Sequence, residues 1–124
     1  MDVRLKRVYE PALASDGYRV LIDRLWPRGV SREKAHLDEW ARELAPSAPL
    51  RRWFDHDPAR FAQFRRRYTD ELAVHATKLG ELRERAKSGT LTLVYGARDI
   101  EHNDAVVLAE ILERPNPQPA KQEP

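Results

Sequence analysis

Seven residues, "DRLWPRG" from Asp23 to Gly29, bring two arginines, a carboxylate and a tryptophan together at the end of a run of branched apolar residues. A guanidinium group binds a carboxylate or a phosphate through two parallel hydrogen bonds, so a pair of arginines suits an anion. Tryptophan adds a flat apolar surface on which a ring can stack. The stretch therefore predicts one wall of an anion-binding pocket.

A second polar stretch, "GARDIEHN" from Gly96 to Asn103, follows another apolar run. Ligands of open α/β sheets bind beyond the carboxyl ends of the strands, so we expect the two stretches to face a common hollow. A nucleotide or a phosphorylated metabolite is the ligand class that these groups suit. The predicted ligand-binding residues are Arg24, Trp26, Arg28, Arg98 and Asn103.

Three residues of these stretches are candidates for catalysis. Asp99 and His102 are three positions apart and can form an acid/base couple on one helical turn, while Asp23 can serve as a nucleophile or base. The same residues also suit structural roles, because Asn103 is a good helix cap and Asp23 or Asp99 can pair with an arginine between the two loops. Whether the protein is an enzyme stays open, and the sequence leaves any cofactor unknown.

Two other charged stretches are weaker candidates. His56 lies between two aspartates, but this ligand set is incomplete and Asp57 is better used as a cap before Pro58, so no metal site is predicted. The arginines of "FRRRY" (64–68) suit nucleic acid, yet the net charge of the chain is only +2 and such runs are usually solvated helix faces. A structural or protein-interaction module without catalysis is a further alternative.

The elements that must position these groups follow from the apolar patterns. Val20, Leu21 and Ile22 are consecutive, which is typical of a strand covered on both faces, and we expect helices above and below it. Strands are predicted at 3–9, 18–24 and 90–96, and helices at 37–45, after Ser47, from Asp57 through the stripe of Phe61, Phe64, Tyr68 and Leu72 towards Gly89, and at 105–112.

This order of elements predicts a single α/β domain over residues 1–114, with a small sheet of about three strands, at least partly parallel, packed with several helices. The short connector between the first two strands leaves a hairpin-like pairing open as the alternative. The proline-rich segment 115–124 is predicted to be a disordered tail.

The composition of the chain limits its possible cysteine chemistry and its cellular compartment. The chain has no cysteine, which excludes disulfides and thiolate chemistry and favours the cytoplasm. Its first residues lack the apolar core of a secretion signal, and no apolar run is long enough to cross a membrane. Nothing in the sequence indicates the oligomeric state.

Several blocks of the chain, including "DGYRVLIDRLWPRG", "LRRWFDHDPARF" and "TLVYGARDIEHNDAVVL", resemble the YeaO-like branch of the domain-of-unknown-function-488 family. The resemblance implies a compact bacterial α/β protein and no particular activity. More distant relatives carry cysteine and histidine in the segment equivalent to "ARDIEHN", so a thiol mechanism is out of reach here, and Asp104 after Asn103 departs from the usual pattern in a way that alters the pocket charge. The family's motif positions fall on Asp23, Arg24, Trp26, Pro27, Arg28, Gly29, Trp53, Phe54, His56, Arg98, Asp99, His102 and Asn103.

Overall fold

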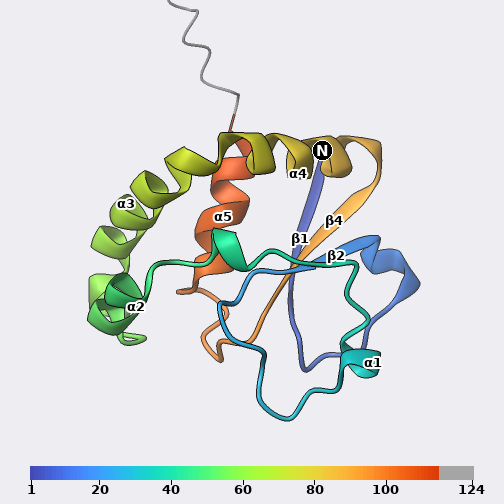
Figure 1. Cartoon of the computed structure of the whole chain (residues 1–124), viewed down its shortest axis with the longest axis horizontal. Coiled ribbons are helices and arrows are strands. Elements are labelled where there is room, and N and C mark those ends of the chain that lie inside the picture. The colour runs from blue at the N-terminus through green and yellow to red at the C-terminus, as the bar shows by residue number, and fades with distance from the viewer. Residues whose placement is uncertain (115–124) are drawn as a thin grey trace, which may run out of the picture.

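A computed structural model describes residues 1–114 of the chain, so the predicted disordered tail lies outside the described residues. The described part is one α/β domain whose sheet has four parallel strands in the order β1-β4-β2-β3 (Figure 1). The strands are β1 (Asp2–Arg7), β2 (Tyr18–Leu21), β3 (Glu39–Trp40) and β4 (Thr90–Tyr95). The helices are α1 (Arg32–Ala35), α2 (Ala48–Phe54), α3 (Phe61–Leu72), α4 (Ala76–Ser88) and α5 (Asp104–Glu113).

The sheet resolves the question that the sequence left open. β1 and β2 are parallel but do not pair with each other, because β4 lies between them and bonds to both. The expected class, a small and at least partly parallel sheet packed with helices, is confirmed, with one strand more than the three predicted. The additional strand β3 lies where the spacing of Leu37, Trp40, Ala41 and Leu44 predicted a helix, which was wrong.

The apolar stripe of segment 37–45 is satisfied by two short elements instead of one helix. β3 pairs with β2 through only two residues, and a 3₁₀ helix, Arg42–Leu44, follows at once. Ala41 and Leu44 are both buried in the main core. Apolar residues spaced three and four positions apart therefore indicate burial in this segment, but they do not indicate an α-helix.

The two faces of the sheet are covered differently. α4 and α5 pack on β1 and β4 on one face, and α3 packs against α5, as the arc of α3 and α4 over α5 in Figure 1 shows. The core on that face contains Val20, Ile22 and Leu93, whereas Leu21 and Val94 point to the opposite face. Two-sided burial of β2 is thus as expected. However, the second face is covered by the β2–β3 connector with its single short helix α1, and not by a layer of helices.

Local signals place the helix starts that matter for the site. Ser47 caps α2 by accepting a hydrogen bond from the Leu50 amide (3.3 Å), and Asn103 caps α5 by accepting one from the Val106 amide (2.9 Å). The carboxylate of Glu71 on α3 accepts hydrogen bonds from the amide (2.8 Å) and hydroxyl (2.6 Å) of Ser47. The start of α2 is therefore tied to α3.

Candidate functional site

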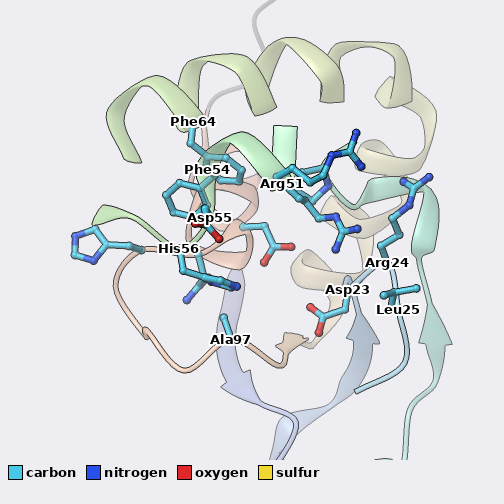
Figure 2. Close-up of a pocket in the computed structure, with 14 residues that line it drawn as sticks. Asp23, Arg24, Leu25, Arg51, Phe54, Asp55, His56, Phe64 and Ala97 are labelled. Atoms are coloured by element: carbon cyan, nitrogen blue, oxygen red, sulfur yellow. The ribbon is translucent and has the colours of Figure 1, made fainter. Parts of the chain in front are cut away.

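A cavity of about 380 Å³ lies beyond the carboxyl ends of β2 and β4, between α2 and the start of α5 (Figure 2). Segments from four parts of the chain meet there. The cavity is lined by Asp23, Arg24, Leu25, Pro46, Arg51, Arg52, Phe54, Asp55, His56, Phe64, Ala97, His102, Asn103 and Asp104.

Asp23 enters the cavity from the end of β2, as Figure 2 shows. Its Oδ2 accepts a hydrogen bond from the Gly96 amide (3.0 Å) at the end of β4, and a Cβ on Gly96 would stand only 2.8 Å from that oxygen. The Trp40 indole donates to the Asp23 carbonyl (2.7 Å) and fixes the backbone. Burial raises the pKa of Asp23 to about 6, against the opposing effects of the Gly96 amide and the Arg51 charge.

Asp104, the first residue of α5, is a second carboxylate in the cavity. Burial and the negative charge of Asp23 raise its pKa to about 7, while the amides at the start of α5 and the charge of Arg51 act in the opposite direction. Two like charges so placed do not both ionise freely. Near neutral pH the Asp23–Asp104 pair therefore holds a proton for part of the time.

Three arginines line the same cavity from two elements. Arg24 follows β2, and Arg51 and Arg52 lie on α2, whose other side is buried through Leu50 and Phe54. All three are exposed. Within residues 1–114, their guanidinium groups form no ion pair and no hydrogen bond with the protein. The cavity thus offers cationic groups with unused donors beside two carboxylates.

His102 is oriented by a carboxylate. Its Nδ1 lies 2.9 Å from Oδ2 of Asp99, whose other oxygen accepts from the amides of Glu101 (2.9 Å) and His102 (3.0 Å). The Glu101 amide is the largest of the effects that lower the pKa of Asp99, and the side chain and amide of His102 add to it. Because Asp99 holds Nδ1, Nε2 is the ring nitrogen of His102 left for another partner.

The buried Asn103 amide is used within the protein. Its oxygen caps α5, and its nitrogen donates to the Asp99 carbonyl (2.8 Å). It lines the cavity. The prediction of a capping role is therefore confirmed, and its predicted ligand contact stays a prediction.

The structure brings together only part of the predicted site. Asp23, Arg24, His102 and Asn103 line the cavity, whereas Trp26, Arg28, Arg98 and Asp99 do not. Arg28 and Arg98 are exposed. The common hollow that we expected between these two arginines is not formed by this cavity.

Trp26 lies on the other face of the sheet. Its ring meets that of Trp40 edge to face with centroids 5.4 Å apart, its indole donates to the Val30 carbonyl (2.7 Å), and the Arg32 guanidinium lies 4.5 Å from its ring centroid. These contacts belong to the second core cluster. The position of Trp26 is therefore that of a packing residue, away from the cavity.

Five polar lining residues were missing from the predicted site: Arg51, Arg52, Asp55, His56 and Asp104. One signal existed for Asp104, since an acidic residue just after a cap and a strand-end loop begins a helix at the edge where ligands bind. The arginines of α2 had only their place on the polar side of a short amphipathic helix, and this pattern does not show what the helix approaches. Among residues 1–114, no group of three or more histidine, aspartate or glutamate side chains is placed to hold a metal ion.

The run Arg65–Arg67, which suggested nucleic acid, is divided between different surroundings. Arg65 pairs with Glu110 (2.9 Å) on α5, and the Arg67 guanidinium lies 4.6 Å from the ring centroid of Trp53. Arg66 is exposed. The run therefore does not present three neighbouring free cations to one partner.

No helix of the described residues has the length and apolar character that crossing a membrane requires.

Comparison with known proteins places this arrangement in a family. The family model described as the inactive DUF488-N3 subclade matches residues 2–123. The uncharacterised protein YeaO of Escherichia coli is 46% identical over 112 residues, which cover 90% of this chain and 97% of YeaO. The uncharacterised protein Rv3073c of Mycobacterium tuberculosis is 41% identical over 110 residues, 89% of this chain and 92% of its own. No solved structure matches the chain. The resemblance expected from the sequence is thus confirmed, and the chain belongs to the inactive DUF488-N3 subclade.

Proposed function

We propose that this protein binds a small anionic ligand, a nucleotide or a phosphorylated metabolite, in the cavity beyond β2 and β4. The observation that carries the proposal is the set of three guanidinium groups, Arg24, Arg51 and Arg52, that line the cavity without a partner inside the described domain. Guanidinium groups bind phosphate oxygens through paired, charge-assisted hydrogen bonds. The volume of about 380 Å³ is in the range usual for small-ligand sites.

The arginines, rather than the helix amides, are the anion-binding groups in this proposal. Phosphate often binds to the free amides at a helix start. At the start of α5, however, the Val106 amide is bonded to Asn103, and the amides of Asp104 and Ala105 already act on the Asp104 carboxyl, whose pKa they lower. A phosphate there would meet a negative charge, so the side of the cavity formed by α2 and Arg24 is the favourable one.

Binding without turnover is the form of the function that the family description supports. The subclade is described as inactive, and the chain lacks the cysteine on which a thiol mechanism depends. A second candidate, proton transfer with Asp23, Asp99 and His102 as the catalytic groups, rests on the 2.9 Å contact that orients His102. Release of phosphate or base from nucleotides and sugar phosphates by the native protein, and its loss in His102→Asn, would establish that candidate.

The binding proposal is tested by calorimetric titration of the full chain with inorganic phosphate, ribose 5-phosphate and AMP. We expect at least one of these to bind, and Arg51→Gln and Arg52→Gln each to weaken binding by about tenfold, the effect of one charge-assisted hydrogen bond. Arg66→Gln is the matched control, because Arg66 is an exposed arginine of α3 that does not line the cavity. The affinity of Arg66→Gln for each anion should equal that of the native chain.

Two further variants test whether the ligand binds in the cavity or at the site predicted from the sequence. Arg28→Gln and Arg98→Gln remove exposed arginines that lie outside the cavity. If these weaken binding and the α2 variants do not, the ligand binds elsewhere and the proposal fails. It also fails if none of the three anions binds.

A further inference from the structure

The carboxylates of the cavity are not explained by anion binding alone. Asp23 and Asp104 lie beside the three arginines, and a ligand that was only an anion would be repelled by both. Oδ2 of Asp23 accepts from the Gly96 amide, but its Oδ1 has no donor within the described part of the chain. This oxygen belongs to a side chain on the cavity wall, so it is free to accept a hydrogen bond from a ligand.

We infer that the ligand is a guanine nucleotide, whose base donates its N1–H and 2-amino groups to the Asp23–Asp104 carboxylates while its phosphate reaches the arginines of α2 and Arg24. The inference rests on the proposed function and adds to it the identity of the base. It follows from the presence of acceptors and unpaired cations within one cavity.

The acceptor end of the cavity selects among bases. A carboxylate has acceptors only and needs adjacent donors to fill both oxygens. Guanine presents two adjacent N–H donors on its Watson–Crick edge. Adenine alternates a donor with an acceptor there, and uracil presents one donor between two acceptors. Guanine is thus the common base whose edge complements a carboxylate without repulsion.

The apolar part of the cavity wall favours a ligand with a planar ring over a ligand that offers the carboxylates only an ammonium group. Pro46, Phe54, Phe64 and Ala97 line the cavity with apolar surface, and the rings of Phe54 and Phe64 stack on each other with centroids 4.4 Å apart. Leu25, which also lines the cavity, is 68% exposed. An aromatic base can cover such a surface while its edge bonds to the carboxylates, whereas an ammonium group leaves it in water.

Ionisation of Asp23 and Asp104 predicts that the preference for guanine depends on pH. Burial raises the pKa of Asp23 to about 6, and burial together with Asp23 raises that of Asp104 to about 7, so the acceptors form fully only above neutral pH. The other charged or titratable groups that line this cavity are Arg24, Arg51, Arg52, Asp55, His56 and His102. The ratio of GMP to AMP affinity should therefore rise between pH 6 and 8, because the two nucleotides carry the same phosphate and its second ionisation at about pH 6 affects both equally.

The test compares GMP, IMP and AMP by calorimetric titration of the full chain at pH 6 and pH 8. IMP keeps N1–H and lacks the 2-amino group. At pH 8 we expect GMP to bind at least tenfold more tightly than AMP, with IMP between them, since each lost hydrogen bond to a charged group costs about tenfold. The preference for GMP should shrink at pH 6.

Variants assign the preference to the carboxylates. Asp104→Asn and Asp23→Asn should each reduce the ratio of GMP to AMP affinity to near one and leave ribose 5-phosphate binding equal or tighter. Asp70→Asn, at an exposed residue of α3 that does not line the cavity, is the control and should keep the preference. Equal binding of GMP and AMP by the native chain, with phosphate binding retained, overturns this inference alone. Absence of binding by every phosphate-bearing probe overturns the proposed function as well.

Discussion

Replacing Asp104 by asparagine should change how the stability of the protein depends on pH. The pKa of Asp104 is raised from 3.8 to about 7 in the folded chain. The folded state therefore binds this proton more tightly than the unfolded state, by about 4 kcal/mol at about 1.4 kcal/mol per pH unit. Because Asp104 is half-buried, solvent screening reduces the expected contribution to about 2 kcal/mol.

The sign follows from the direction of that pKa. Below pH 4 the carboxyl is protonated in both states, and its stabilising contribution is fully present. As pH rises, the unfolded chain ionises first, so the free energy of unfolding falls until pH passes about 7, where the folded chain ionises too. Asp23, whose pKa is raised to about 6, acts in the same direction. Asp99, whose pKa is lowered, has its effect at acid pH, below its ordinary pKa of 3.8.

Urea denaturation followed by circular dichroism, at steps of half a pH unit from pH 4.5 to 8.5, measures how the free energy of unfolding depends on pH. The free energy of unfolding of Asp104→Asn, relative to the native chain, should rise by about 2 kcal/mol across the range. Asp55→Asn is the control, because Asp55 is exposed and its left-handed φ of 48° suits asparagine. Parallel curves for the native chain and Asp104→Asn would refute the claim that burial and Asp23 oppose ionisation of this group.

Four other substitutions test packing and ion pairing in the fold by urea denaturation. Gly96→Ala places a Cβ 2.8 Å from Oδ2 of Asp23 and should cost about 1–3 kcal/mol, whereas Gly80→Ala, inside α4 with no atom within 4 Å, should stabilise by about 0.5–1 kcal/mol; equal effects would contradict the contact. Trp26→Phe should cost about 1 kcal/mol through its lost hydrogen bond and leave calorimetric ligand affinity unchanged, so a weaker affinity would return Trp26 to the site. Asp16→Asn should cost about 3 kcal/mol because it leaves a buried arginine without its counter-charge, and a loss under about 0.5 kcal/mol would show the pair to be dispensable.

The strands and caps were predictable because each depends on a few adjacent residues. The consecutive Val20, Leu21 and Ile22 alternate between the two faces of β2, and both faces are covered. Ser47 and Asn103 cap the helices that their positions indicated. The pairing partner of each strand was not predictable, since nothing local in β1 states that its neighbour is β4, 88 positions further along.

The site was predictable in part for the same reason. Asp23 and His102 lie at strand ends, where the general rule for α/β sheets places ligands. Arg28 does not line the cavity, and the chain between Asp23 and Arg28 passes through Trp26, whose ring packs against Trp40 on the other face of the sheet. Arg51 reaches the cavity through the packing of α2 on α3, which is a property of the assembled fold.

The central place of β4 in the sheet has a consequence for how the chain is made. β4 is the last strand along residues 1–114, and until it inserts, β1 and β2 have no backbone ladder between them. Folding must therefore wait for contacts between distant parts of the chain, which slows two-state folding and leaves the nascent apolar strands exposed. The sheet therefore forms only after Thr90–Tyr95 has been synthesised, and a chain interrupted before Thr90 would be a substrate for chaperones and proteases.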